Sequence, residues 1–254
     1  MYIFIVVDLH YHVYYNSRMS KKCVLPISGG LDSTVIMHMA HAEGYEIHSL
    51  TFHYGQRHYR AELGCAREQA QKLAHTHRLI DAGFIRELAS TSALTNDMIK
   101  VAKTKDVLGD PQTVNYVPNR NMMMLSMCTA YAETVGAETV FHGAALVDSQ
   151  AGFWDGSQEF LRAINNVNKL NRRTSIEIVA PLILKSKKDI VQTGHDLGVD
   201  FKQTWTCYEG QEQACGECTA CSSRIKGFID AGLIDPLEYA IDIPWEKYGA
   251  KPIT

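Results

Sequence analysis

Ser28-Gly29-Gly30-Leu31-Asp32-Ser33-Thr34 is the stretch that decides the fold of this 254-residue chain. It follows the apolar run KKCVLPIS (21–28), which predicts a strand, and it precedes a helical pattern over 34–42. Two adjacent glycines let backbone N–H groups approach an anion, and the N-terminus of the next helix adds partial positive charge. The hydroxyl groups supply further donors, and Asp32 can hold Mg²⁺ or cap the helix. The turn is predicted to bind phosphate.

A Gly-Gly pair alone would also suit an ordinary strand-to-helix turn in which Asp32 or Ser33 caps the helix. The chain, however, contains neither GxxxxGK[ST] nor GxGxxG, the two commoner phosphate-binding patterns. SGGLDS instead resembles the SGGxDS pyrophosphate loop of the N-type ATP pyrophosphatases, which act on ATP at its α-phosphate. This resemblance favours an ATP site over a plain turn.

Apolar, β-branched runs alternate with helical patterns on the carboxyl side of this turn. Strands separated by helices of this length predict an α/β fold, a Rossmann-like parallel sheet with helices on both faces. The irregular segment 96–119 is predicted to cross the carboxyl edge of that sheet, where substrates bind in open α/β folds. The expected strands are 46–54, 77–82, 138–145 and 177–184, and the expected helices are 59–74, 121–135, 159–170 and 186–198.

The pattern divides the chain into three parts. Residues 1–20 are predicted to be an N-terminal extension, and residues 21–203 the nucleotide-binding domain. Residues 204–254 are predicted to form a small cysteine-rich appendage with an irregular tail, because this segment carries most of the cysteines and then three prolines.

Four of the seven cysteines crowd together as C-x7-C-x2-C-x2-C. Each x2 spacing lets two thiolates point into one small volume, and four sulfurs close a tetrahedral shell that leaves no position for water. A structural zinc is therefore favoured. An iron–sulfur cluster is the alternative, although its fourth ligand would lie upstream and no Cys-Pro follows. The predicted ligands are Cys207, Cys215, Cys218 and Cys221.

Composition excludes several classes of protein. Charged residues make up 21% and apolar residues 46%, as in an ordinary globular protein, and the net charge of -3 gives no basic field for nucleic acid. The apolar run at 1–10 is interrupted by Asp8 and has no basic start, so neither a signal peptide nor a membrane span is expected. A cytoplasmic, reducing location is expected.

Several ordered motifs show that the chain from about 23 to 229 is similar to the 7-cyano-7-deazaguanine synthases (QueC) of queuosine biosynthesis. The motifs are SGGLDST (28–34), TFHYGQRH (51–58) with Glu62, VPNRN (117–121), the segment 143–148, APL (180–182) with Lys187, TWTCYEG (204–210) and CGECTAC (215–221).

The resemblance implies a fold like that of the adenine nucleotide alpha hydrolases and an ATP-dependent carbon–nitrogen ligase. Such enzymes adenylate the carboxylate of 7-carboxy-7-deazaguanine and release pyrophosphate. Ammonia then displaces AMP to give an amide, and a second adenylation yields the nitrile. ATP is the cosubstrate, with Mg²⁺ and a structural zinc, and a homodimer is common in the family.

The resemblance also implies roles for single residues. Asp32, Ser33, Arg120 and Lys187 are the expected catalytic residues. The nucleotide is expected on Ser28, Gly29, Gly30, Asp32, Ser33, Thr34, Gln56, Arg57 and His58, and the deazaguanine acid on Asn121, Asp148, Asp155 and Glu159. For three of them an ordinary role is nearly as well supported: Arg120 as the partner of a carboxylate, His58 as a solvated loop histidine, Lys187 as an exposed helix charge.

One stretch departs from the family. Its usual Tyr-Pro-Asp-Cys-Arg-x-Glu-Phe reads here Phe153-Trp154-Asp155-Gly156-Ser157-Gln158-Glu159-Phe160, with one extra residue before it. Gly156 and Ser157 replace Cys and Arg, and a small hydroxyl cannot supply the five donors of a guanidinium. The alternative function is therefore a QueC-like ligase of a phage or antiviral-defence system, which stops at the amide or couples the acid to another amine, such as one on a protein.

Two other classes receive less support from the sequence. An RNA-modifying member of the pyrophosphatase fold would need a basic platform or a paired redox cysteine, and the sequence suggests neither. A non-enzymatic zinc-ribbon binding module would not need the intact nucleotide loop.

Overall fold

The computed structural model describes residues 21–104 and 114–253. The predicted N-terminal extension, 1–20, and part of the predicted loop, 105–113, lie outside the described residues.

A five-stranded parallel sheet forms the centre of the molecule. The strand order is β3-β2-β1-β4-β5, so the chain winds outward in one direction from β1 and then returns to continue on its other side. This is a Rossmann-like strand order, and the predicted α/β fold class is confirmed. The strands are β1 (Lys22–Pro26), β2 (Glu46–His53), β3 (Thr76–Asp81), β4 (Thr139–Phe141) and β5 (Glu177–Val179).

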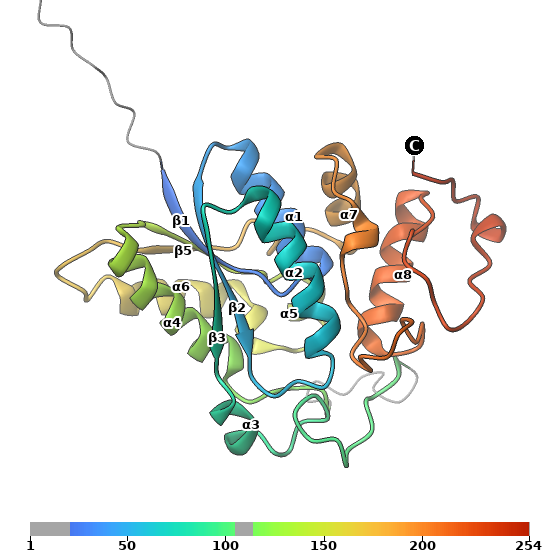
Figure 1. The fold of residues 1–254 in the computed structure, drawn as a ribbon, viewed down its shortest axis with the longest axis horizontal. Helices are drawn as coiled ribbons and strands as arrows, with labels where there is room; N and C mark the ends of the chain where they lie inside the picture. The colour runs from blue at the N-terminus through green and yellow to red at the C-terminus, as the bar shows by residue number, and fades with distance from the viewer. Residues whose placement is uncertain (1–20, 105–113, 254) are drawn as a thin grey trace, which may run out of the picture.

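Helices cover both faces of the sheet (Figure 1). One face carries α1 (Leu31–Ala42), α2 (Tyr59–Leu73), α7 (Lys187–Asp196) and α8 (Thr219–Ala231), and the other carries α4 (Arg120–Val135) and α6 (Gln158–Asn168). The shorter helices are α3 (Phe84–Leu88) and α5 (Leu146–Gln150), with 3₁₀ turns η2 (Trp154–Gly156), η3 (Phe201–Gln203) and η4 (Trp245–Tyr248).

Strand β1 shows why both faces must be covered. Successive side chains of a strand point to opposite faces, so Leu25 packs in the core beneath α1 while Val24 packs in the core beneath α4. Both side chains are almost completely buried. A parallel strand buried on both sides reads as a continuous apolar run, which is how CVL appears in the sequence.

Three elements differ from the sequence prediction. The predicted strands 138–145 and 177–184 contain only three sheet residues each, because the chain leaves the sheet early to form walls and turns at its carboxyl edge. Residues 204–254, predicted to be a cysteine-rich appendage with an irregular tail, contain the 13-residue helix α8, whose Phe228 joins the core beneath α1. The cysteines at 218 and 221 have the spacing of metal ligands, and for this reason the helical pattern that follows them was not recognised in the sequence.

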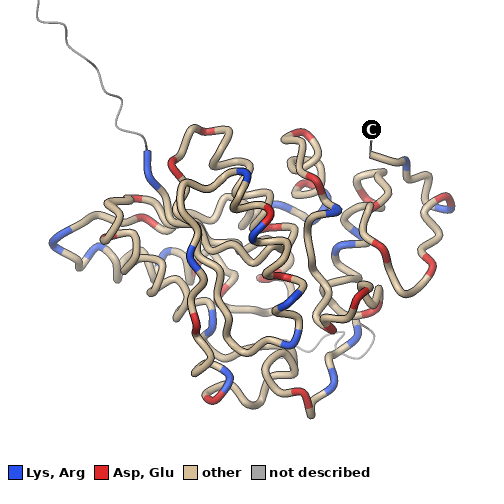
Figure 2. The backbone as a smooth tube through the Cα atoms, viewed as in Figure 1, with Lys and Arg blue, Asp and Glu red and all other residues tan. Residues whose placement is uncertain are grey.

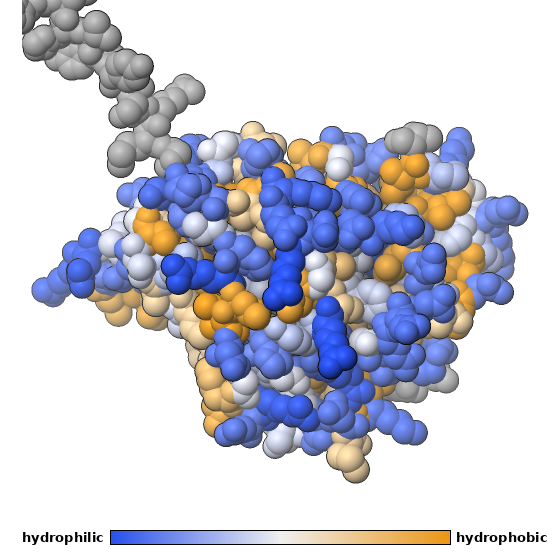
Figure 3. Space-filling model, in the orientation of Figure 1, coloured by the Kyte–Doolittle hydropathy of each residue, from blue (hydrophilic) through white to orange (hydrophobic). Residues whose placement is uncertain are grey.

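The surface fits the compositional expectation. Acidic and basic residues are interspersed along the tube in Figure 2, and no side of that view is uniformly basic. The face shown in Figure 3 is mostly hydrophilic, with apolar side chains in small separate groups. Within residues 21–104 and 114–253, no helix is both long and apolar enough to cross a membrane.

Candidate functional site

A cavity of about 390 Å³ brings most of the predicted site residues together. It lies where β1 and β2 end. The segments after β4 and β5 also reach it, as does the part of the chain that carries the four clustered cysteines (204–221, the cysteine segment). The predicted residues that line it are Ser28, Gly30, Asp32, Ser33, Gln56, His58, Arg120, Asn121, Asp148, Asp155 and Lys187. Four others do not line it: Gly29, Thr34, Arg57 and Glu159.

Gly29 is the residue that lets the loop 28–34 (the glycine loop) pack against helix α2. Its φ is 78°, and a Cβ at this position would lie 2.5 Å from the carbonyl oxygen of Glu62 and 2.6 Å from the amide nitrogen of Ala66. Only glycine fits this left-handed position against another backbone. Gly29 therefore shapes the loop from behind instead of lining the cavity.

The loop leaves the start of α1 open. Its N-cap, Gly30, provides no side-chain cap, so the amides of the first turn lack the side-chain acceptor that usually satisfies them. The Oγ atoms of Ser28 and Ser33 lie 3.1 Å apart, and the Ser33 hydroxyl donates to the Gly30 carbonyl oxygen at 3.2 Å. A helix N-terminus in this state is a ready site for an anion. Thr34, one residue further, is fully buried.

Lys187 and Asp32 form the ion pair next to this loop. The ammonium Nζ of Lys187 lies 2.7 Å and 2.8 Å from the two carboxylate oxygens of Asp32. Lys187 is the first residue of α7, and α8 approaches it so closely at Gly227 that a Cβ there would overlap the lysine side chain. The packing of two helices thus directs the lysine toward the glycine loop. An exposed lysine on a helix surface would not be held in this way.

Arg120 begins helix α4 on the opposite wall of the cavity. Its Nη1 donates to the Tyr54 hydroxyl at 3.2 Å and its Nε donates to Oδ1 of Asn121 at 3.2 Å. Burial alone disfavours the cation, but the charges and hydrogen bond of Tyr54, together with Tyr208 and Asp155, raise the pKa of Arg120. Arg120 is therefore a fixed positive charge in the cavity.

Two carboxylates line the cavity near α5 and η2. Burial raises the pKa of Asp148 to about 6, against the effect of the Ala145 amide, which donates to its Oδ2 at 2.8 Å. Burial also raises the pKa of Asp155, and the positive charge of Arg120 opposes that rise. His58 is buried, which lowers its pKa, so this imidazole is neutral at pH 7.

Gly156 and Ser157 serve local packing. A Cβ at Gly156 would lie 2.5 Å from Cβ of Asp148, so no side chain fits there. The Ser157 hydroxyl caps α6: it accepts from the Phe160 amide at 3.1 Å and donates to the Trp154 carbonyl oxygen at 2.7 Å. Glu159 is exposed and does not line the cavity.

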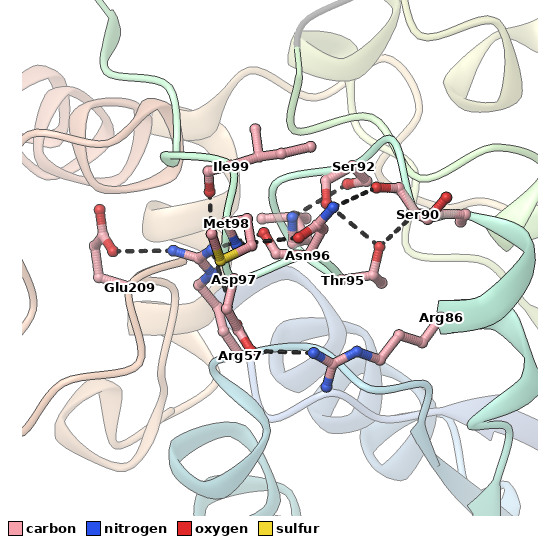
Figure 4. A network of polar contacts seen from close by, with 12 residues as sticks. Arg57, Arg86, Ser90, Ser92, Thr95, Asn96, Asp97, Met98, Ile99 and Glu209 are labelled. Carbon is pink, nitrogen blue, oxygen red and sulfur yellow. Dashed lines mark hydrogen bonds and ion pairs between the residues drawn. The ribbon is translucent and has the colours of Figure 1, made fainter.

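Arg57 faces the loop that follows α3, and Figure 4 shows its guanidinium among the groups of that loop. Its Nη2 donates to the carbonyl oxygens of Asn96 at 3.1 Å and Ile99 at 2.9 Å, and its Nη1 lies 3.5 Å from a carboxylate oxygen of Glu209. The residue joins three segments: the turn after β2, the loop, and the start of the cysteine segment. Its neighbours Gln56 and His58 contact the cavity in its place.

Beyond Ile99 the same loop is attached to the cysteine segment. Lys103 forms a backbone bridge with Cys218 and an ion pair of 2.5 Å with Glu217. Asn115 donates to the Thr219 hydroxyl at 3.3 Å. Because Asn115 also lines the cavity, with Tyr116 and Val117, the cysteine segment braces one cavity wall.

Replacing Arg57 with alanine is expected to raise KM for a substrate that binds in this cavity about tenfold with little change in kcat, because the loss of charge-assisted hydrogen bonds loosens one wall. Steady-state kinetics with that substrate varied would measure KM and kcat separately, and Arg57→Lys should recover part of the loss. Arg60→Ala, at a nearby exposed arginine of α2, is the control. A fall in kcat with unchanged KM would contradict this role.

The four predicted metal ligands meet at one point. Their sulfur atoms all lie within 4.8 Å of one another, and those of Cys215 and Cys221 are 3.9 Å apart. A tetrahedral site with Zn–S bonds of about 2.3 Å requires sulfurs about 3.8 Å apart. Backbone amides point at three of the sulfurs, such as the Cys218 amide at 3.3 Å from Sγ of Cys215. This donor set fits a tetrahedral metal.

Several cavity residues were not predicted from the sequence. Their signals were weak, since aromatic and small polar residues have no distinctive spacing. Tyr116 and Phe153 stack with ring centroids 6.1 Å apart, and the Trp154 indole donates to the Tyr116 hydroxyl at 2.8 Å. The unpredicted residues include Tyr54, Asn115, Tyr116, His142, Phe153, Trp205, Thr206, Tyr208, Thr219 and Ser223.

The chain matches a family model and curated proteins along most of its length. Residues 22–232 match the family model described as queuosine biosynthesis protein QueC. The 7-cyano-7-deazaguanine synthase of Pseudoalteromonas atlantica is 40% identical over 221 residues, which cover 87% of this chain and 100% of that protein. The synthase of Thermoplasma acidophilum is 38% identical over 232 residues, 90% of this chain and 93% of that protein.

Among solved structures, the NH3-dependent NAD synthetase from Campylobacter jejuni, in complex with a nitrate ion, has 14% identity and a TM-score of 0.43. The match covers 72% of this chain and 67% of that one, and the likeness is too weak to bear on the site. The family model, by contrast, extends across both the glycine loop and the cysteine segment. The chain therefore belongs to the queuosine biosynthesis protein QueC family.

Proposed function

We propose that the chain is a 7-cyano-7-deazaguanine synthase, an ATP-dependent carbon–nitrogen ligase. It would adenylate the carboxylate of 7-carboxy-7-deazaguanine, convert the acid with ammonia to the nitrile, and release AMP and pyrophosphate. The observation that carries this proposal is the match to curated synthases over 87% of the chain, with the glycine loop, Lys187 and Arg120 facing one cavity.

The pyrophosphate end of ATP would bind at the loop 28–34 and the open N-terminus of α1. Lys187 would neutralise charge on the α-phosphate as it is attacked, and Asp32 would hold Mg²⁺ there. Such preorganised charges contribute most where new charge develops in the transition state. The remaining rate acceleration would come from holding the acid and the nucleotide together in one cavity.

The deazaguanine acid would occupy the wall formed by Arg120, Asn121 and Asp155. Arg120 attracts the substrate carboxylate, and a buried carboxylate such as Asp155 can accept from N–H groups of the base. The stacked rings of Tyr116 and Phe153 offer an apolar edge to a flat heterocycle. Glu159, which lies outside the cavity, is not assigned to the substrate.

A structural zinc on the four cysteines and Mg²⁺ with ATP complete the proposed cofactors. The zinc would hold the cysteine segment and not act on the substrate, because four protein ligands leave no open position. We further infer a cytoplasmic homodimer, with 21–203 as the catalytic domain and 204–254 as the metal-binding part.

The curated relatives named above favour the synthase over a ligase that stops at the amide or uses another amine. Gly156 and Ser157, the residues that suggested such a ligase, are explained by packing against Asp148 and by capping α6. The loss of the family's Cys-Arg pair therefore does not by itself require another acceptor.

The test is incubation of the purified protein with ATP, Mg²⁺ and 7-carboxy-7-deazaguanine, with and without ammonium, while pyrophosphate, AMP and product mass are followed. Nitrile formed only with ammonium is the expected result. Pyrophosphate release that ends at the amide would move the assignment to the other ligase. No acid-dependent turnover would refute the proposal.

A further inference from the structure

We propose that Asp148 is the catalytic residue that binds the incoming ammonia and accepts its proton when the carbon–nitrogen bond forms. This inference rests on the proposed function and gives a distinct task to a residue that the resemblance assigned only to substrate binding.

Asp148 lies on the same side of the cavity as the activating groups. It belongs to the first turn of α5, which follows β4 at the carboxyl edge of the sheet. Its side chain lines the cavity together with Gly30, Asp32 and Lys187, and the charges of Asp32 and Lys187 both act on it. An acyl adenylate whose phosphate is at the glycine loop would therefore present its carbonyl carbon near this carboxylate.

The side chain of Asp148 is fixed with one oxygen available. Oδ2 accepts a hydrogen bond from the Ala145 amide at 2.8 Å, and the other carboxylate oxygen has no hydrogen-bond partner within 21–104 and 114–253. Gly156 packs directly on its Cβ, so the side chain cannot move to that side. A rigid carboxylate with one free oxygen is suited to accept an N–H from a small ligand.

The surrounding charges favour a small cation or ammonia. The groups that face Asp148 are Asp32 on α1, Asp155 on η2, Tyr208 of the cysteine segment and Lys187 on α7, and Lys187 is already paired with Asp32. Burial raises the pKa of Asp148 to about 6, so it is mostly ionised at neutral pH and still basic enough to take a proton.

The proposed step balances in atoms and charge. The ammonia nitrogen attacks the acyl carbon of the adenylate, and a carbon–nitrogen bond forms. One N–H proton of the tetrahedral adduct passes to the free oxygen of Asp148. The carbon–oxygen bond to the phosphate then breaks, AMP leaves with the electron pair, and the amide remains. Asp148 later returns the proton to solvent.

The decisive variant is Asp148→Asn, whose side-chain oxygen can still accept from the Ala145 amide. Single-turnover release of pyrophosphate from ATP and the acid, without ammonium, is expected to stay within about twofold of wild type. Amide formation at fixed ammonium is expected to fall about 100-fold, the lower range for removal of a general base. At a constant concentration of free, unprotonated ammonia, this second step in wild type should also slow as pH falls through about 6, and the variant should lack that dependence.

Asp189→Asn is the matched control, because Asp189 is likewise the third residue of its helix, α7, accepts a hydrogen bond from the N-cap amide and is exposed. It should change neither step. Equal loss of pyrophosphate release and amide formation in Asp148→Asn would show a nucleotide-binding role and overturn the proposal, as would unchanged amide formation. If wild type itself releases no acid-dependent pyrophosphate, the proposed function fails instead.

Discussion

Replacing Lys187 with methionine is expected to lower steady-state pyrophosphate release by about 10²- to 10³-fold, the range seen when one preorganised transition-state group is removed. The ammonium of Lys187 is held 2.7 Å from Asp32 and directed at the glycine loop by the close approach of α8. Methionine keeps most of the length and apolar bulk of the side chain but cannot neutralise phosphate charge. The effect should be mainly on kcat.

Lys188→Met is the matched control, because Lys188 is the next residue of α7 and is exposed. Its turnover should stay within about twofold of wild type, since surface charges contribute little. Thermal unfolding of both variants would separate catalysis from folding. A loss of less than threefold in a folded Lys187→Met protein would contradict the role of this lysine.

The fold and the cavity were predictable from the sequence to different degrees. SGGLDST predicts its strand, turn and helix because the glycines, the apolar run and the helical period agree locally. The cysteine spacing predicts a sulfur cluster for the same reason, since all four ligands lie within 15 residues. Local agreement of this kind needs no knowledge of distant contacts.

Residues whose role depends on distant segments could not be placed from the sequence. Arg57 stands between two cavity residues, Gln56 and His58, yet its guanidinium bonds with carbonyls about 40 positions away. Tyr54 gains its role only because Arg120, 66 positions later, donates to it. The direction of a side chain at a strand end is set by such tertiary contacts, and adjacency in a motif does not report it.

Replacing Cys218 with serine is expected to remove the metal and to raise KM for the deazaguanine acid more than tenfold, because metal-bound segments lose much of their order with the metal. Cys218 is buried and its backbone pairs with Lys103 of the loop. Val101 of the same loop packs in the cluster that contains three of the four cysteines. Loss of the centre should therefore release the wall formed by residues 115–117.

Three measurements check this expectation: metal content by native mass spectrometry, KM for the acid, and the rate of tryptic cleavage at Lys100 and Lys103, which should increase with the loosened loop. Cys65→Ser is the control, because Cys65 is half-buried near the same cluster but outside the sulfur group, and burial raises its pKa to about 11, so it stays a thiol. Metal loss with unchanged KM and unchanged cleavage would show that the loop is held without the metal, and that the link between the cysteine segment and the substrate wall is only spatial.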